Sequence, residues 1–192
     1  MAEAGRVISG LARGIRLQAP PAVTRPLTDR VKQSLFGAML ADGAVGEGTA
    51  FLDLFAGSGA AGIEALSLGA GEAVFVERDG GAARVIGANL ERTGLTGGRV
   101  VRLDAVRWLD RPAEPPAPFN GAVVDPPYGD EELLAATLER LGRSGAGWLA
   151  DGALVVAKHF WRDELPDRVG QLTRERDKRF GETMLTFYRY QP

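Results

Sequence analysis

A glycine-rich stretch between an apolar run and a predicted helix could hold a nucleotide. Residues 49–55 are mostly apolar, as expected for a buried parallel strand. Gly57, Gly59 and Gly62 follow, and residues 63–68 are predicted to be helical. Glycines let the backbone approach a ligand closely, and the helix N-terminus offers free N–H groups. The spacing also fits the G-x-G-x-x-G pattern of dinucleotide sites, so the glycines alone do not identify the ligand.

A second stretch with chemical potential is Asp125-Pro126-Pro127-Tyr128, which follows an apolar run at 121–124. Transfer of a methyl group to a planar exocyclic amine needs hydrogen-bond acceptors, because positive charge builds on the nitrogen. The Asp125 carboxylate and the Pro126 carbonyl are candidate acceptors, and the prolines bring no competing N–H donor. Tyr128 offers a ring on which a target base could stack, a contact worth ~1–3 kcal/mol. Hydride transfer has no use for this motif, so it favours a methyltransferase.

Acidic residues stand at the ends of successive predicted strands. Strands expected at 73–76, 99–103 and 121–124 alternate with helices, which predicts a parallel sheet covered on both faces. Ligands of such sheets bind beyond the carboxyl ends of the strands. The acids at these ends are Asp53, Glu77, Asp104 and Asp125. Glu77 lies 20 residues after Gly57, where an acid can bind the ribose hydroxyls of NAD or of S-adenosylmethionine.

The remaining predicted elements complete an α/β fold. Residues 6–18 are expected to form a β-hairpin, and Thr28 can cap the helix that follows it. Asp79 can cap a helix that runs to about Arg92. A fifth central strand is expected at 153–157. Strands near 170–177 and 184–189 lie too close together for a helical crossover, which indicates an antiparallel hairpin. We therefore expect a mostly parallel sheet of seven strands with a small N-terminal hairpin extension.

Composition narrows the chemistry. The chain of 192 residues has no cysteine and a single histidine, His159, which argues against thiolate chemistry and against a metal site. No apolar run approaches the ~20 residues of a membrane span. The first residues lack the features of a signal peptide, so we expect a cytoplasmic protein.

The charge is distributed unevenly along the chain. It is +4 over residues 1–35, −8 over 36–157 and +2 over 158–192. A basic N-terminal segment on an acidic protein commonly binds a polyanionic partner. A solvated loop that binds nothing would show the same charge. The arginines expected to contact RNA are Arg6, Arg13, Arg16 and Arg25.

Residues 53–62 and 125–128 together resemble the amino-methyltransferases of the Rossmann-like class I fold, which has seven strands. The stretches 6–14, 25–36 and 179–183 are similar to the RsmD family of bacterial small-subunit rRNA guanine-N2 methyltransferases. This resemblance covers nearly the whole chain. It implies S-adenosylmethionine as the cofactor and a guanine N2 amine of 16S rRNA, free or in an assembling small subunit, as the target. It also implies a monomer without a metal.

The resemblance further implies roles for individual residues. Asp53, Gly57 and Gly59 would border the methionine half of the cofactor, and Glu77 would bind its ribose. The full implied cofactor set is Asp53, Phe55, Gly57, Ser58, Gly59, Glu77, Asp104, Ala105, Thr28, Asp29 and Arg30. The implied catalytic set, which would hold the guanine, is Asp125, Pro126, Pro127 and Tyr128. We expect residues 1–27 to be an RNA-binding extension and residues 28–192 to be the methyltransferase domain.

Alternative functions stay open from the sequence. An NAD-dependent oxidoreductase would need a substrate domain, for which the chain leaves little room. A methyltransferase acting on DNA adenine N6 or on a protein glutamine would use the same motifs. Enzymes of this class that act on protein amides commonly carry Asn where Asp125 stands. His159 and Trp161, after the fifth strand, are expected to be rim or packing residues.

Overall fold

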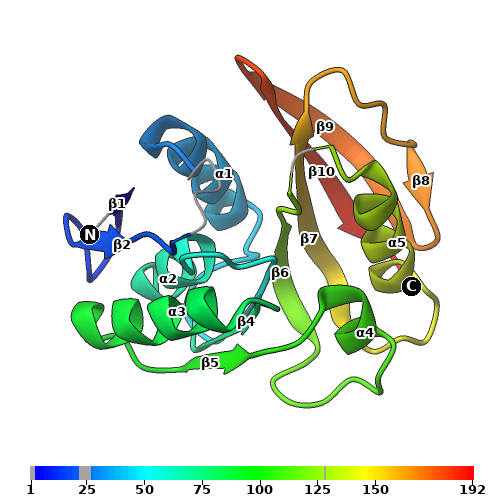
Figure 1. The fold of residues 1–192 in the computed structure, drawn as a ribbon. Coiled ribbons are helices and arrows are strands. Elements are labelled where there is room, and N and C mark those ends of the chain that lie inside the picture. The colour runs from blue at the N-terminus through cyan, green and yellow to red at the C-terminus, as the bar shows by residue number, and fades with distance from the viewer. Residues whose placement is uncertain (1–2, 22–26, 128) are drawn as a thin grey trace.

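The computed structural model describes residues 3–21, 27–127 and 129–192 (Figure 1). Its central sheet has eight strands in the order β5-β4-β3-β6-β7-β10-β9-β8. Their bounds are β3 (Ala50–Leu54), β4 (Glu72–Val76), β5 (Gly98–Val101), β6 (Phe119–Val124), β7 (Leu149–Phe160), β8 (Arg168–Val169), β9 (Leu172–Phe180) and β10 (Thr183–Tyr190). The first five in the sheet order are parallel, and β10, β9 and β8 are antiparallel to their neighbours. The α/β class and the C-terminal hairpin are confirmed, and the two-residue β8 adds an edge strand to the expected seven.

Helices cover both faces of this sheet (Figure 1). They are α1 (Asp29–Ala41), α2 (Ala60–Ser67), α3 (Gly80–Thr93), α4 (Ala105–Leu109) and α5 (Glu131–Leu141). Helices α1, α2 and α3 share one core with Leu154 and Val156 of β7, whereas α4 and α5 share the other with Val155 and Ala157. Successive strand residues point to opposite faces, so one apolar strand serves both cores. In the described parts of the chain, no helix is long and apolar enough to span a membrane.

Side-chain caps fix where the helices begin. Thr28 Oγ1 accepts a hydrogen bond from Val31 N at 3.4 Å, and Asp79 Oδ1 accepts one from Ala82 N at 2.7 Å. Both caps were predicted from the sequence. Asp104 caps α4 in the same way. Each cap satisfies an N–H of the first turn that has no partner inside its helix.

The N-terminal hairpin is a separate two-stranded sheet of β1 (Glu3–Arg6) and β2 (Arg16–Gln18). The first strand lies earlier than expected, because only Arg6 of β1 falls within the predicted range 6–18, and the connection between the strands turns at Gly10, where φ is +74°. Gly10 also packs against α2. A Cβ at this position would lie 1.8 Å from the carbonyl oxygen of Ser67, so only glycine fits.

A buried ion pair fastens this connection to the body of the protein. The side chains of Lys32 and Glu64 are fully buried, with 3.6 Å between Nζ and Oε2. Glu64 accepts hydrogen bonds from the N–H groups of Ile8 and Ser9, at 3.1 and 2.8 Å, and Lys32 donates to the carbonyl of Arg6. Burial raises the pKa of Glu64 and lowers the pKa of Lys32. Each charge therefore depends on its partners inside the protein.

Asn89 of α3 joins the hairpin to the glycine loop. This side chain is fully buried, and its Oδ1 accepts a hydrogen bond from Gln18 N at 2.8 Å. Its Nδ2 donates to the carbonyls of Gln18 and Ser58, at 3.0 and 2.9 Å. The hairpin and the loop before α2 are thus both hydrogen-bonded to the same side chain, Asn89.

Candidate active site

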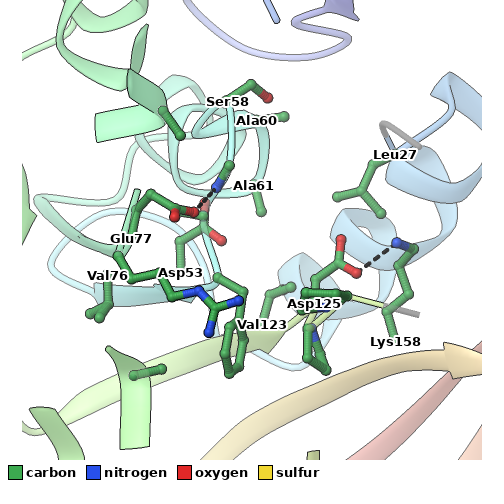
Figure 2. Close-up of a pocket in the computed structure, with 18 of the residues that line it drawn as sticks. Leu27, Asp53, Ser58, Ala60, Ala61, Val76, Glu77, Val123, Asp125 and Lys158 are labelled. Atoms are coloured by element: carbon green, nitrogen blue, oxygen red, sulfur yellow. Dashed lines mark hydrogen bonds and ion pairs between the residues drawn. The ribbon is translucent and has the colours of Figure 1, made fainter. Parts of the chain in front are cut away.

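A cavity of about 970 Å³ opens at the carboxyl ends of the parallel strands (Figure 2). Its volume is at the upper end of the range for ligand pockets, ~300–1,000 Å³. Of the residues predicted from the sequence, it is lined by Asp53, Phe55, Gly57, Ser58, Glu77, Ala105, Asp125, Pro126 and Pro127. A ligand on the glycine loop and a ligand at the Asp125 turn would therefore share one space.

The loop between β3 and α2 adopts conformations that favour glycine. Gly57 and Gly59 have φ of +55° and +78°, and Phe55 is a non-glycine residue at +63°. Such a conformation costs a residue with a side chain ~1–3 kcal/mol and is typical of functional sites. At Gly62 a Cβ would lie 2.3 Å from the ring of Phe75, so glycine lets α2 pack directly on β4. Gly59 precedes α2 and is not part of the cavity lining.

Asp53 supports the first turn of α2. The residue is only 2% exposed, and its Oδ2 accepts a hydrogen bond from Gly62 N at 2.8 Å. Gly59, at the N-cap position, has no side chain for this purpose, so Asp53 supplies the missing cap. Burial raises the pKa of Asp53 well above its usual range, and the charges of Asp125 and Glu77 add to the shift. Its place beside the methionine half of a cofactor stays a prediction.

Glu77 ties the glycine loop to the end of β4. Its Oε2 accepts a hydrogen bond from Gly57 N at 2.9 Å, and its Oε1 accepts one from Asp79 N at 2.8 Å. A carboxylate has about four lone-pair sites, so both oxygens can accept further hydrogen bonds from a ligand. Glu77 therefore orders the loop and also presents a negative charge to the cavity (Figure 2).

Part of the wall beside Glu77 is apolar, although the charged Arg78 and Asp79 also line the cavity. Val76, Leu103 and Ala105 line this side of the cavity. Asp104, predicted beside an adenine, caps α4 and is not part of the lining. An apolar slot next to a carboxylate suits a flat ring attached to a ribose.

Asp125 follows β6 and is held by Lys158 of β7, a residue that the sequence analysis missed. Lys158 Nζ lies 2.6 Å from Asp125 Oδ1, and the two side chains are 6% and 22% exposed (Figure 2). Burial raises the pKa of Asp125, and Lys158 opposes this shift by favouring the carboxylate. A signal was present in the sequence, since alternation along a strand puts position 158 on the same face as Leu154 and Val156.

Three predicted cofactor residues at the start of α1 lie outside the cavity lining. Thr28 caps the helix, Asp29 forms an ion pair with Arg6, and the Arg30 guanidinium packs over an aromatic ring of β9. Leu27, directly before them, does line the cavity. Contact of Thr28, Asp29 and Arg30 with a cofactor stays a prediction.

The arginines expected to contact RNA differ in their surroundings. Arg6 and Arg16 each form an exposed ion pair with a nearby carboxylate. Arg13 is exposed and makes no ion pair with any residue that the structure describes. Arg25 and Tyr128 lie outside the described residues. An exposed ion pair contributes only ~0–1 kcal/mol, so a phosphate can compete with the carboxylate for the arginine. RNA contact by these arginines stays a prediction.

His159 belongs to the packing of the sheet. Its Nε2 lies 2.8 Å from Thr186 Oγ1, which joins β7 to β10. Burial lowers the pKa of His159. Within residues 3–21, 27–127 and 129–192, no three His, Cys, Asp or Glu side chains are grouped so that they could hold a metal ion.

Two comparisons of the sequence match nearly the whole chain. A family model described as "Conserved hypothetical protein 95" matches residues 5–189. The "Putative rRNA methyltransferase YlbH" of Bacillus subtilis is 40% identical over 186 residues, which cover 96% of this chain and 98% of that protein. The "Ribosomal RNA small subunit methyltransferase D" of Escherichia coli K12 is 35% identical over 184 residues, which cover 95% of this chain and 88% of that protein.

The fold agrees with a solved structure of similar length. The "Putative methyltransferase yhhF from Escherichia coli" superposes with a TM-score of 0.86 at 33% identity, and the match covers 99% of each chain. The strand order, the glycine loop and the Asp125 turn thus occur in a chain that matches these relatives over 95–99% of its length. The chain belongs to the RsmD family of rRNA methyltransferases.

Proposed function

We propose that this chain transfers a methyl group from S-adenosylmethionine to the exocyclic N2 amine of a guanine in 16S rRNA. The observation that carries the proposal is the cavity that joins the Glu77 side of the glycine loop to the turn at Asp125. Direct transfer requires the cofactor and the target base to meet in one space. Relatives at 35–40% identity whose names state rRNA methyltransferase support the substrate class. Membership of this family also favours methyl transfer over hydride transfer.

The half of the cavity beside the glycine loop fits S-adenosylmethionine. When bound, this cofactor supplies the methyl group on a positively charged sulfur. Acidic residues outnumber the basic Arg78 and Lys158 in the lining, so the cavity favours a cationic ligand; the acidic ones are Asp53, Glu77, Asp79, Asp125, Glu131, Asp163 and Glu182. Glu77 would accept hydrogen bonds from the ribose hydroxyls. The apolar wall beyond it would hold the adenine ring.

The half of the cavity beside Asp125 would hold the amine. The Asp125 carboxylate and the Pro126 carbonyl would accept hydrogen bonds from its two N–H groups as positive charge builds on the nitrogen. Lys158 donates to Oδ1 of Asp125, which leaves Oδ2 for the base. Once the amine carries the methyl group and the cofactor has left as a neutral thioether, the Asp125 carboxylate would take up the proton that the nitrogen must release. Lys158 favours the ionised form of Asp125, which is the form that can accept.

A deletion strain tests this function. Small-subunit rRNA from the strain should lack one N2-methylguanine, located by primer extension under limiting nucleotides and by mass spectrometry of nuclease fragments. A plasmid with the wild-type gene should restore the methyl group, and the same plasmid with Asp125→Ala should not. Unchanged rRNA would refute the proposal. A methyl group lost instead from DNA adenine or from a protein glutamine would favour the corresponding alternative.

We also propose that residues 1–27 are an RNA-facing extension of a catalytic domain formed by residues 28–192. The separate sheet of the hairpin and its exposed Arg13 support this division. Each phosphate contact adds about −0.7 to −0.9 to the slope of log affinity against log salt concentration. Replacing Arg6, Arg13 and Arg16 together with Gln should flatten this slope by up to ~2–3 units. An unchanged slope would place the RNA on another surface.

A further inference from the structure

A tryptophan at the end of β7 packs against two guanidinium groups. The Arg179 guanidinium carbon lies 3.7 Å from the centroid of the Trp161 ring, and that of Arg162 lies 4.9 Å from it. The backbone here is fixed as well. Trp161 N donates to the carbonyl of Glu182 at 3.0 Å, so the segment after β7 is bonded to the turn between β9 and β10.

The guanidinium groups of Arg162 and Arg179, here called the arginine pair, have no carboxylate partner among the described residues. Neither Arg162 nor Arg179 forms an ion pair there, and Arg179 Nε donates to a backbone carbonyl at 2.9 Å, which leaves its two terminal nitrogens for a ligand. Other arginines of β9 and β10, by contrast, are paired. Arg174, Arg176 and Arg189 each form an ion pair with an aspartate or glutamate.

Two unpaired guanidinium groups on one ring repel each other. Both lie within one Debye length at 0.1 M salt, ~10 Å, so the repulsion between them is only partly screened. The face of an indole ring attracts cations and holds both groups in place. An anion bound by these guanidinium groups would offset their repulsion. The two guanidinium groups therefore form a site that favours a negatively charged ligand.

The pair stands directly beside the mouth of the cavity. Phe160, which directly precedes Trp161, and Glu182, whose carbonyl accepts the hydrogen bond from Trp161 N, both line the cavity. Asp163 also lines it, and its carboxylate accepts a hydrogen bond from Phe160 N at 3.1 Å, which holds the segment after β7 in a tight turn. A ligand bound by Arg162 and Arg179 would thus be a neighbour of any base inside the cavity.

We propose that Arg162 and Arg179, stacked on Trp161, form a binding site for the RNA backbone next to the methylated nucleotide. The inference rests on the proposed function and adds a phosphate site to it. A base that enters the cavity must leave its stack, and the protein must hold the flanking backbone while it does so. A guanidinium edge binds two phosphate oxygens at once, and stacking on an aromatic ring leaves that edge free.

The test compares two variants that lose exposed arginines. The double variant Arg162→Gln/Arg179→Gln removes the proposed site. The control, Arg168→Gln, removes an exposed arginine of the edge strand β8 that also has no ion pair within the described chain. The probes are a 16S rRNA transcript made in vitro and small subunits assembled from it. Affinity is measured by filter binding at several salt concentrations, and methyl transfer is measured with labelled S-adenosylmethionine.

The double variant should weaken binding of the better probe roughly tenfold or more, because two charge-assisted contacts are lost. It should flatten the salt slope by ~1.4–1.8 units. The KM for RNA should rise in parallel, while the affinity for S-adenosylmethionine and the kcat at saturating RNA stay near wild type. Trp161→Ala should show part of the same loss, and Trp161→Phe less, because a ring remains.

The possible outcomes separate the two proposals. A double variant with the same salt slope and KM as Arg168→Gln would overturn the phosphate site, whatever the wild type methylates. A wild type that binds the RNA but transfers no methyl group to either probe would overturn the proposed function. In that case the difference in salt slope would still decide whether Arg162 and Arg179 bind RNA.

Discussion

The two halves of the cavity hold their carboxyl groups in different ways. On the side of the glycine loop, Asp53 and Glu77 accept hydrogen bonds from backbone N–H groups, and the donors lie 2 to 20 residues away in the sequence. On the other side, Asp125 is held by the ammonium group of Lys158, 33 residues away on the neighbouring strand. The loop side is thus held by backbone donors around the paired strands β3 and β4, whereas the Asp125 side is held by a charged side chain of β7 and exists only once β6 and β7 are paired. The roles proposed for these side chains differ accordingly and can be tested one by one.

The largest effect is expected at Asp125. Asp125→Ala removes an acceptor that acts as charge builds on the amine, so kcat should fall ~10²-fold or more, by analogy with other single transition-state contacts. The affinity for S-adenosylmethionine, measured by calorimetry, should stay nearly unchanged. If the variant instead loses cofactor affinity and keeps its kcat, the two halves of the cavity have been assigned the wrong way round.

A smaller effect, and one on binding, is expected at Glu77. Glu77→Gln keeps one oxygen acceptor but loses the charge that would bind the ribose hydroxyls. Charge-assisted hydrogen bonds contribute ~1.5–3 kcal/mol, so the Kd for S-adenosylmethionine should rise about 10- to 100-fold. Glu77→Ala should be worse, because the N–H groups of Gly57 and Asp79 also lose their acceptor. Equal affinities of wild type and Glu77→Gln in calorimetry would contradict the ribose assignment.

Lys158 should act through the pKa of Asp125. Because burial raises that pKa and Lys158 opposes the shift, Lys158→Met should raise it further. The carboxylate would then be protonated up to a higher pH, so the acid limb of the kcat profile should move to higher pH. Near neutral pH we expect a loss of about tenfold that is partly recovered at higher pH. Lys158→Arg, which keeps the charge, is the control, and an unmoved acid limb in Lys158→Met would exclude this role.

The smallest effect on catalysis is expected at Asp53. Its role is tested through the free energy of unfolding and the dependence of that energy on pH. The pKa of Asp53 is raised in the folded protein, so its contribution to stability is complete below the unfolded pKa of ~3.9. It is lost as the pH rises through the folded pKa, at no more than ~1.4 kcal/mol per pH unit. Asp53→Asn has no such titration. The free energy of unfolding of wild type relative to Asp53→Asn, from urea denaturation, should therefore fall with rising pH, and a constant difference would be inconsistent with a buried acid.

What the sequence could predict follows the same division between local and distant contacts. The alternation of strands and helices gave the α/β class, and the residues at helix starts gave the caps Thr28 and Asp79. The glycine spacing and the Asp125 turn located two sides of one cavity. The caps, the glycine spacing and the Asp125 turn are each defined by residues close together in the sequence, where spacing alone determines the geometry.

The features that the sequence did not reveal are contacts between distant segments. The predicted fifth strand ended at Ala157, because Lys158 and His159 resemble the polar end of a strand. Pairing with β10 carries β7 on to Phe160 and buries both polar side chains. Glu64 likewise resembles a polar position on a short helix, and its partners in the hairpin are more than 50 residues away.

The shared support at Asn89 has a consequence for the order in which the protein is made. The hairpin strands leave the ribosome before the helices on which they dock, yet two strands alone are marginally stable. Their partners, Glu64, Ser67 and Asn89, are synthesised later. The hairpin must therefore wait until α3 has emerged before all of its contacts can form. Its strands are made before its partners and dock after them.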